Sequence, residues 1–342
     1  MSQAFQNLGE PISRPLHPSP MWLLCTGCLL LAASCLPGQD TTIRTTVPIV
    51  VLPVTVTDAK GHFTYGLTPS DFVLLDNGRP VPVRVDDPDS GVAPPRLVIL
   101  VQTSDLSNSA LLKIRKTGSM IEQAVLGAKG EAAVLTFADA VTLVQDFTSN
   151  VDQLSDAFSD LQRADSGQGR MLDAVSKAMN MLANRAGSAA SSILIIGENK
   201  DRGSETKLDE LLQRIQRSPV TINTLVYSAY LTAFTTKGSE YTPPDGGGFI
   251  KAITETARLA KKNASTTLTA ATGGQSFRFE TQSKLENNLI RLGQELNSRY
   301  LVSFTPEQEP VPSFHTIAIK IKDQPQLTVR TRPGYWSDLH TH

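Results

Sequence analysis

The chain has 342 residues, of which 40% are hydrophobic and 19% are charged, and its net charge is −1. This length predicts about two domains with a sizeable hydrophobic core. The chain has no excess of basic residues that would favour nucleic acid as a partner. It also has no acidic tail that would indicate disorder.

The first part of the chain, 1–38, has the pattern of an export signal. A polar, proline-rich start precedes an apolar run over 21–33, which is shorter than the ~20 residues of a membrane helix. We therefore predict an exported protein of the periplasm, cell envelope or extracellular space, with an uncleaved anchor as the alternative. All three cysteines, Cys25, Cys28 and Cys35, lie here, so the rest of the chain has no disulfide. Lipidation of Cys35 would be a second route to membrane attachment.

Short β segments follow the signal. Residues 47–57 are rich in β-branched side chains and predict a strand, in which Pro48 and Pro53 favour an edge or a bulge. Thr68-Pro69 predicts one helical turn. The segments 72–75 and 81–85 flank an Asn-Gly pair, which predicts a hairpin.

From Leu97 onward, short apolar strands alternate with amphipathic helices. We predict strands at 97–101, 132–137, 141–147, 192–196, 221–227 and 276–279, and helices at 111–125, 151–161, 171–182, 208–215, 249–262 and 285–298. This alternation is typical of a mostly parallel sheet with helices on both faces.

The chain then returns to β structure, with strands predicted at 300–304, 316–322 and 327–329. Two or three strands are not stable alone, so the two β segments are expected to pack together. The predicted fold is α/β, with a Rossmann-like domain at 95–298 inserted in a small β-sandwich. The sandwich is formed by 43–90 and 299–336, and a tail covers 337–342.

Several motifs together resemble a known family. They are "VTVTDAKGHFTYGLTPSDFVLLDNG" (54–78), "QTSDLS" after the first α/β strand, "GRMLDAV" (169–175), "ILIIGENKDRGS" (193–204), "ATGG" (271–274) and "FHTIAIKIKD…VRTRPGYW" (314–336). They are similar to the von Willebrand factor type A related proteins first catalogued in acidobacteria. The resemblance implies protein binding, in some members through a metal-ion-dependent adhesion site. That site uses D-x-S-x-S after the first strand, a Thr from a second loop and an Asp from a third.

Two alignments of the first loop compete. One matches the motif letter by letter and makes Asp105, Ser107 and Ser109 the ligands of Mg²⁺ or Ca²⁺. The other starts directly at the strand end, where α/β sheets bind ligands, and places Gln102, Ser104 and Leu106 at the ligand positions. We prefer the second, because Asp105 lies three residues beyond the strand and can cap the next helix instead.

The other two loops agree with the second alignment. Gly169 stands where the family has Thr, and it has no side-chain oxygen. Arg170 beside it adds positive charge. Glu198 stands where Asp is expected. We therefore predict a degenerate metal site with no cofactor, and keep metal-dependent adhesion through Asp105, Ser107 and Ser109 as the alternative.

A long loop at 228–248 carries Tyr230, Phe234 and Tyr241, which either bind a partner or cover the domain's own core. Catalysis has little support, because no histidine falls at a strand end of the α/β domain; a hydrolase using Ser104 or Ser107 is the alternative. The prediction is a non-enzymatic module that binds another protein, with a structural envelope component as a further alternative. The sequence leaves the partner's identity and the oligomeric state open.

Overall fold

The structure is a computed structural model, and it describes residues 49–86, 95–104, 108–121, 125–127, 130–185, 190–227, 263–307 and 311–337. The export signal and the aromatic loop predicted above lie outside these residues, as does the helix predicted at 249–262.

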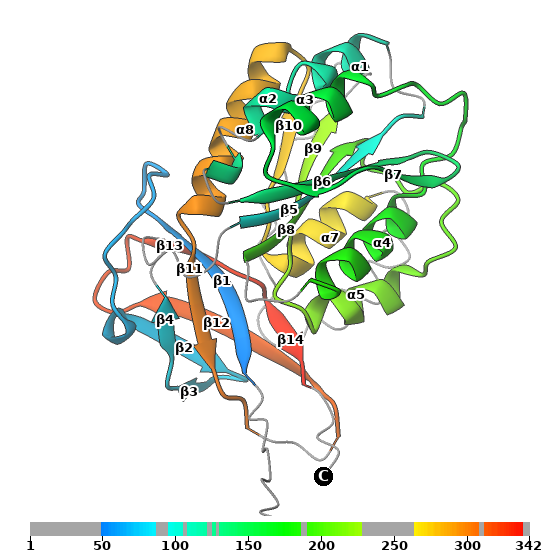
Figure 1. Cartoon of the computed structure of the whole chain (residues 1–342). Helices are drawn as coiled ribbons and strands as arrows, with labels where there is room; N and C mark the ends of the chain where they lie inside the picture. Colours follow the sequence, from blue (N-terminus) through cyan, green and yellow to red (C-terminus); the bar gives the residue numbers. More distant parts are fainter. Residues whose placement is uncertain are drawn as a thin grey trace, which may run out of the picture. The chain divides into compact units, whose positions relative to one another are not determined.

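A six-stranded sheet forms the centre of the α/β part (Figure 1). Its order is β10-β9-β8-β5-β6-β7, which in chain order within this part reads 6-5-4-1-2-3. Neighbouring strands are parallel except for β7, which pairs antiparallel with β6 at one edge. The strands are β5 (Pro95–Gln102), β6 (Glu131–Phe137), β7 (Val141–Thr148), β8 (Ala190–Gly197), β9 (Thr221–Tyr227) and β10 (Ser276–Phe279).

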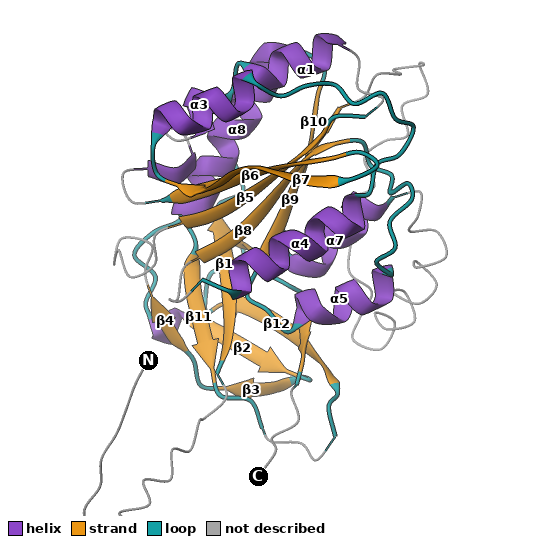
Figure 2. Cartoon of the chain, turned by 45° about the vertical axis from the view of Figure 1, so that its right-hand side comes forward, coloured by secondary structure: helices purple, strands orange, loops and turns teal. Residues whose placement is uncertain are grey.

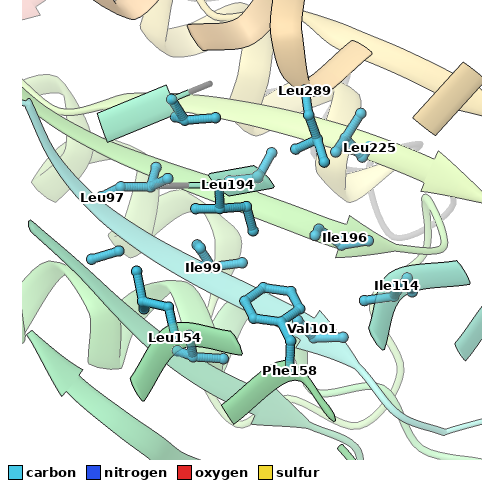
Figure 3. Packing of buried hydrophobic residues seen from close by; sticks show 14 of the residues in the cluster. Leu97, Ile99, Val101, Ile114, Leu154, Phe158, Leu194, Ile196, Leu225 and Leu289 are labelled. Carbon is cyan, nitrogen blue, oxygen red and sulfur yellow. The ribbon is translucent and has the colours of Figure 1, made fainter. Parts of the chain in front are cut away.

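Helices cover both faces of this sheet because its central strand is apolar on both sides. Along β5, the residues at odd positions, Leu97, Ile99 and Val101, pack into one core, as Figure 3 shows. Val98 and Leu100 point into the opposite core. The first core is closed by α1 (Asn108–Arg115), α2 (Gly118–Ile121), α3 (Val151–Ser159) and α8 (Gln282–Asn297). The second is closed by α4 (Met171–Ala183), α5 (Leu208–Gln216) and α7 (Ala264–Thr272), which Figure 2 shows on one side of the sheet.

Helix α7 was missed by the sequence analysis, because five of its nine residues are Ser or Thr, which are poor helix formers. Tertiary contacts stabilise it. Asn199, from the loop after β8, accepts hydrogen bonds at its start from the Thr266 N–H and from the Ser265 hydroxyl. Leu268 is fully buried against the sheet. The packing of one face therefore outweighs the weak intrinsic propensity.

Strands from the two ends of the chain form a β-sandwich. One sheet has the order β13-β1-β11-β4 and the other β14-β12-β2-β3. The strands are β1 (Val50–Thr57), β2 (Phe72–Asp76), β3 (Arg79–Val81), β4 (Arg84–Asp86), β11 (Tyr300–Phe304), β12 (Phe314–Ile321), β13 (Thr328–Arg330) and β14 (Gly334–Trp336). Their inward side chains share one core. The predicted fold class, an α/β domain inserted in a small β-sandwich, is confirmed.

Two local predictions for the sandwich can be compared with the strand pairing. At Pro53, β1 pairs with β11 alone and β13 joins only from Thr55, so Pro53 lies at a local edge as predicted, although β1 stands between two strands in the sheet order. The hairpin at the Asn77-Gly78 turn is correct, with both residues at positive φ. Its second arm ends at Val81, however, and β4 joins the other sheet. Pro82 lies at this break, and a proline cannot donate a ladder hydrogen bond.

Buried arginines connect the sandwich to the α/β part. The Arg332 guanidinium, 2% exposed, donates to the carbonyl oxygens of Gln216 at 3.1 Å and Val220 at 3.3 Å, and also to that of Ser218. These carbonyls lie at and beyond the end of α5, where helix carbonyls lack partners within the helix. Burial lowers the pKa of Arg332 to about 10, so the side chain remains charged at neutral pH.

Candidate functional site

The chain reverses its strand order between β5 and β8, which are adjacent in the sheet although β6 and β7 lie between them in sequence. In open α/β sheets the crevice beyond the carboxyl ends of such strands is the usual ligand site. Gln102 ends β5, and Glu198 directly follows β8. The strand-end residues that the sequence singled out therefore lie side by side at this crevice.

The Gln102 side chain fills the crevice and is fully buried. Its Oε1 accepts a hydrogen bond from the backbone N–H of Glu198 at 2.8 Å. Its Nε2 lies 3.3 Å from the hydroxyl of Ser104, which is also fully buried. Because a backbone N–H can only donate, it fixes the oxygen of the amide toward Glu198 and the NH₂ group toward Ser104. The amide thus presents hydrogens, and not an oxygen, toward Ser104.

Two glycines make room for this side chain. A Cβ added to Gly169 would lie 3.1 Å from Gln102 Nε2, and one added to Gly197 would lie 2.7 Å from Gln102 Oε1. A threonine at 169 would therefore need Gln102 to move. Gly169 and Gln102 therefore fit one another sterically.

Glu198 is engaged elsewhere. Its Oε2 forms an ion pair with Arg202 at 2.7 Å, and its side chain is 28% exposed. Arg170, which the sequence analysis expected to repel a cation, instead faces Glu205 at 3.4 Å and Asp173 at 3.8 Å. The cationic group nearest the candidate ligand Glu198 is thus Arg202, which the motif alignment overlooked.

The second and third loops are tied together by hydrogen bonds. Gly169 and Arg202 exchange two backbone hydrogen bonds, of 2.9 and 3.0 Å. Asp201 Oδ1 accepts from the N–H of Leu172 at 3.0 Å and so caps α4 from the neighbouring loop. The sequence alone gave no signal for this cap, because cap and helix start are far apart in the chain.

Asp173 adds a further link between these loops. Its carboxylate accepts from the Thr206 hydroxyl at 2.6 Å, from the Thr206 N–H at 2.8 Å and from the Glu205 N–H at 3.1 Å. Burial acts to raise the pKa of Asp173, but these hydrogen bonds outweigh it and the pKa is lowered. The carboxylate is therefore ionised at neutral pH and committed to holding the loops.

The remaining candidate residues cannot be placed. Asp105, Leu106 and Ser107 lie outside the described residues, as do Tyr230, Phe234 and Tyr241. Ser109 lies on α1, but the structure does not describe its side chain. The alignment that uses Asp105, Ser107 and Ser109 therefore stays a prediction.

The described residues of the crevice do not fit a divalent cation. Mg²⁺ and Ca²⁺ need several oxygen ligands, most of them carboxylates or carbonyls. Here an amide NH₂ faces Ser104, Gly169 has no side chain, and Glu198 is paired with Arg202. Within the described ranges, no group of three or more His, Cys, Asp or Glu side chains could hold a metal ion.

The geometry does not suggest a hydrolase either. The two histidines that the structure describes belong to the β-sandwich part: His62 follows β1 and pairs with Asp58, and His315 on β12 is buried beside Asp76. Ser104 has Gln102 as its side-chain neighbour and is buried, so it is not poised as a nucleophile.

No family model and no curated protein matches this sequence. Several solved structures are similar in fold. The BatB protein of Bacteroides thetaiotaomicron is 11% identical over 59% of this chain and 98% of its own, with a TM-score of 0.39. A von Willebrand factor type A protein from Catenulispora acidiphila is 10% identical over 84% of this chain and 72% of its own, with a TM-score of 0.44.

Proximal thread matrix protein 1 of the mussel byssus is 12% identical, and its structure has zinc in the metal-ion-dependent adhesion site (MIDAS) motif. The match covers 66% of this chain and half of the mussel protein, with a TM-score of 0.44. In the part of the chain that the structure describes, no helix is both long and apolar enough to span a membrane.

Proposed function

We propose that this chain is an exported, non-enzymatic protein-binding module. Its α/β part, 95–298, would be a von Willebrand type A related domain whose metal-ion-dependent adhesion site has degenerated. The partner would be another protein, bound at the loop-rich carboxyl edge of the sheet. The strand order, the antiparallel β7 and the motif resemblance support the domain assignment.

One observation carries the proposal: the Gln102 amide occupies the crevice at the end of β5. It accepts from the Glu198 N–H and turns its NH₂ group toward Ser104. This amide connects two of the loops by hydrogen bonds, a role that a cation would fill through ligand bonds in a metal-binding relative. The binding face would therefore keep its shape without metal.

Calorimetric titration of residues 39–342 with Mg²⁺, Ca²⁺ and Mn²⁺ tests the loss of metal binding. We expect no binding at micromolar concentration. Micromolar binding that disappears in Asp105→Ala would contradict the proposal and support the alternative site at Asp105, Ser107 and Ser109. A matched control is Asp139→Ala, which removes an exposed aspartate from the turn between β6 and β7.

Capture from envelope extract tests the binding role. A partner should be retained in the presence of a chelator and lost when the loop 228–248 is shortened. A partner released by the chelator would favour metal-dependent adhesion. Turnover in a hydrolase screen, abolished by Ser104→Ala, would favour an enzyme.

A further inference from the structure

A cavity lies between the α/β part and the β-sandwich, away from the loop edge described above. It has a volume of about 460 Å³, within the range of about 300–1,000 Å³ typical of small-molecule sites. Arg96 and Ser191, at the amino ends of β5 and β8, contribute to it, whereas Gln102 and Glu198 lie at the carboxyl ends of the same strands. Its walls also include Val51, Pro53, Leu301, Met179, Leu182 and Arg214.

One wall is apolar because of the alternation along the sandwich strands. In β1, Leu52 and Val54 point into the sandwich core, so Val51 and Pro53 face outward. Leu301 of β11 pairs with Pro53 and joins this outer surface. Met179 and Leu182, on the last turns of α4, supply apolar side chains to the same cavity.

The polar part of the wall is positively charged. Three arginines line the cavity, and no aspartate or glutamate is among its described lining residues. Arg96 is already paired with Glu131 at 2.5 Å. Arg214 donates to the neutral acceptors Ser176 Oγ at 3.0 Å and Asn180 Oδ1 at 2.8 Å, so these contacts orient its guanidinium without neutralising it.

Arg217 is also held in a defined position. Its guanidinium lies 5.7 Å from the centre of the Trp336 ring, a cation–π distance. Trp336 is itself fixed by a hydrogen bond from its Nε1 to Gln216 Oε1 at 3.1 Å. Trp336 does not line this cavity, so Arg214 is the arginine whose oriented guanidinium stands beside the apolar wall. Guanidinium groups bind carboxylates and phosphates through paired hydrogen bonds.

We propose that this cavity binds a small amphipathic oxyanion, with its hydrocarbon body against Val51, Pro53 and Leu301. Its carboxylate or phosphate head would lie at Arg214. The site is independent of the protein-binding face, because it lies at the opposite ends of the parallel strands. Anion binding in this cavity can therefore be tested separately from protein binding at the loop edge.

Calorimetry on the full chain with octanoate, octyl phosphate and octanol, each below its micelle concentration, tests this site. At least one anion should bind at least ten times more tightly than octanol. Arg214→Gln should weaken that binding about tenfold, the effect of losing a charged hydrogen bond. Tighter octanoate would identify a carboxylate head and tighter octyl phosphate a phosphate head; either result supports the site.

Two further variants locate the binding. Ala183→Trp places a large side chain into the cavity from an exposed position on α4 and should abolish binding of both anions. Arg278→Gln removes an exposed arginine from β10, at the far edge of the sheet, and should change nothing. The proposal is overturned if octanol binds as tightly as the anions, if neither anion binds, or if binding survives both Arg214→Gln and Ala183→Trp.

Discussion

The role assigned to Gln102 makes a quantitative prediction for Gln102→Met. Methionine has nearly the same length and is unbranched, so it fits between Gly169 and Gly197, but it cannot accept the 2.8 Å hydrogen bond from Glu198 N–H. The contact to Ser104, at 3.3 Å, is at the long end of hydrogen-bond distances and adds little. Leaving the Glu198 N–H without a partner should cost about 1–3 kcal/mol in the free energy of unfolding.

Urea unfolding followed by fluorescence measures this cost, with Gln162→Met as the control. Gln162 is an exposed glutamine whose side chain bonds only to the nearby carbonyl of Asp160. The control should change stability by less than about 0.5 kcal/mol, as surface substitutions do. If Gln102→Met falls within the same limit, the amide does not hold the loops together and the reasoning for the degenerate site fails.

Three other changes probe the contacts that join the two parts of the chain. Arg332→Met should destabilise the protein by about 1–3 kcal/mol, because it leaves buried carbonyls at the end of α5 without a donor. Thermal unfolding measures this loss, and a fall in the unfolding midpoint no larger than that of a surface variant would refute it. Gly273→Ala should unfold at a lower temperature, since Gly273 has φ +71° and an added Cβ would collide with the Thr331 backbone; an unchanged midpoint would contradict the close approach. Burial opposes ionisation of Glu295, but ion pairs with Arg299 and Arg330, both at 2.7 Å, outweigh it, so its pKa is lowered from 4.5. The stabilisation by the ionised Glu295 is therefore present above pH 4.5 and is lost as the pH falls below it. Urea unfolding measured from pH 7 to pH 3 should show a smaller fall in the free energy of unfolding for Glu295→Gln than for the unchanged protein. An equal fall in both would refute the assignment.

Most of the fold was predictable because the pattern of apolar residues reflects which face of each element is buried. The strand predicted at 276–279 and the helix predicted at 171–182 match β10 and α4 within a residue. The pairing of the two terminal β segments followed from their inability to be stable alone. Helix α7 could not be predicted from the residue pattern, because contacts with Asn199 and the sheet stabilise residues that prefer other conformations.

The candidate site was only partly predictable. The positions of Gln102 at the end of β5 and of Glu198 after β8 could be predicted, because strand ends can be recognised along the chain. Asp201, Arg202 and Asp173 were not recognised, since their partners lie in other loops.

The sequence by itself determined which side chains are available at the strand ends, and therefore that few metal ligands are present in the preferred alignment. Only the tertiary structure decided how those side chains are used. It fixed the direction of the Gln102 amide through the Glu198 N–H, explained Gly169 by the space that amide needs, and paired Glu198 with Arg202. Residue types can be read from one segment, but hydrogen-bond direction, steric room and charge pairing depend on segments that meet only in the folded chain.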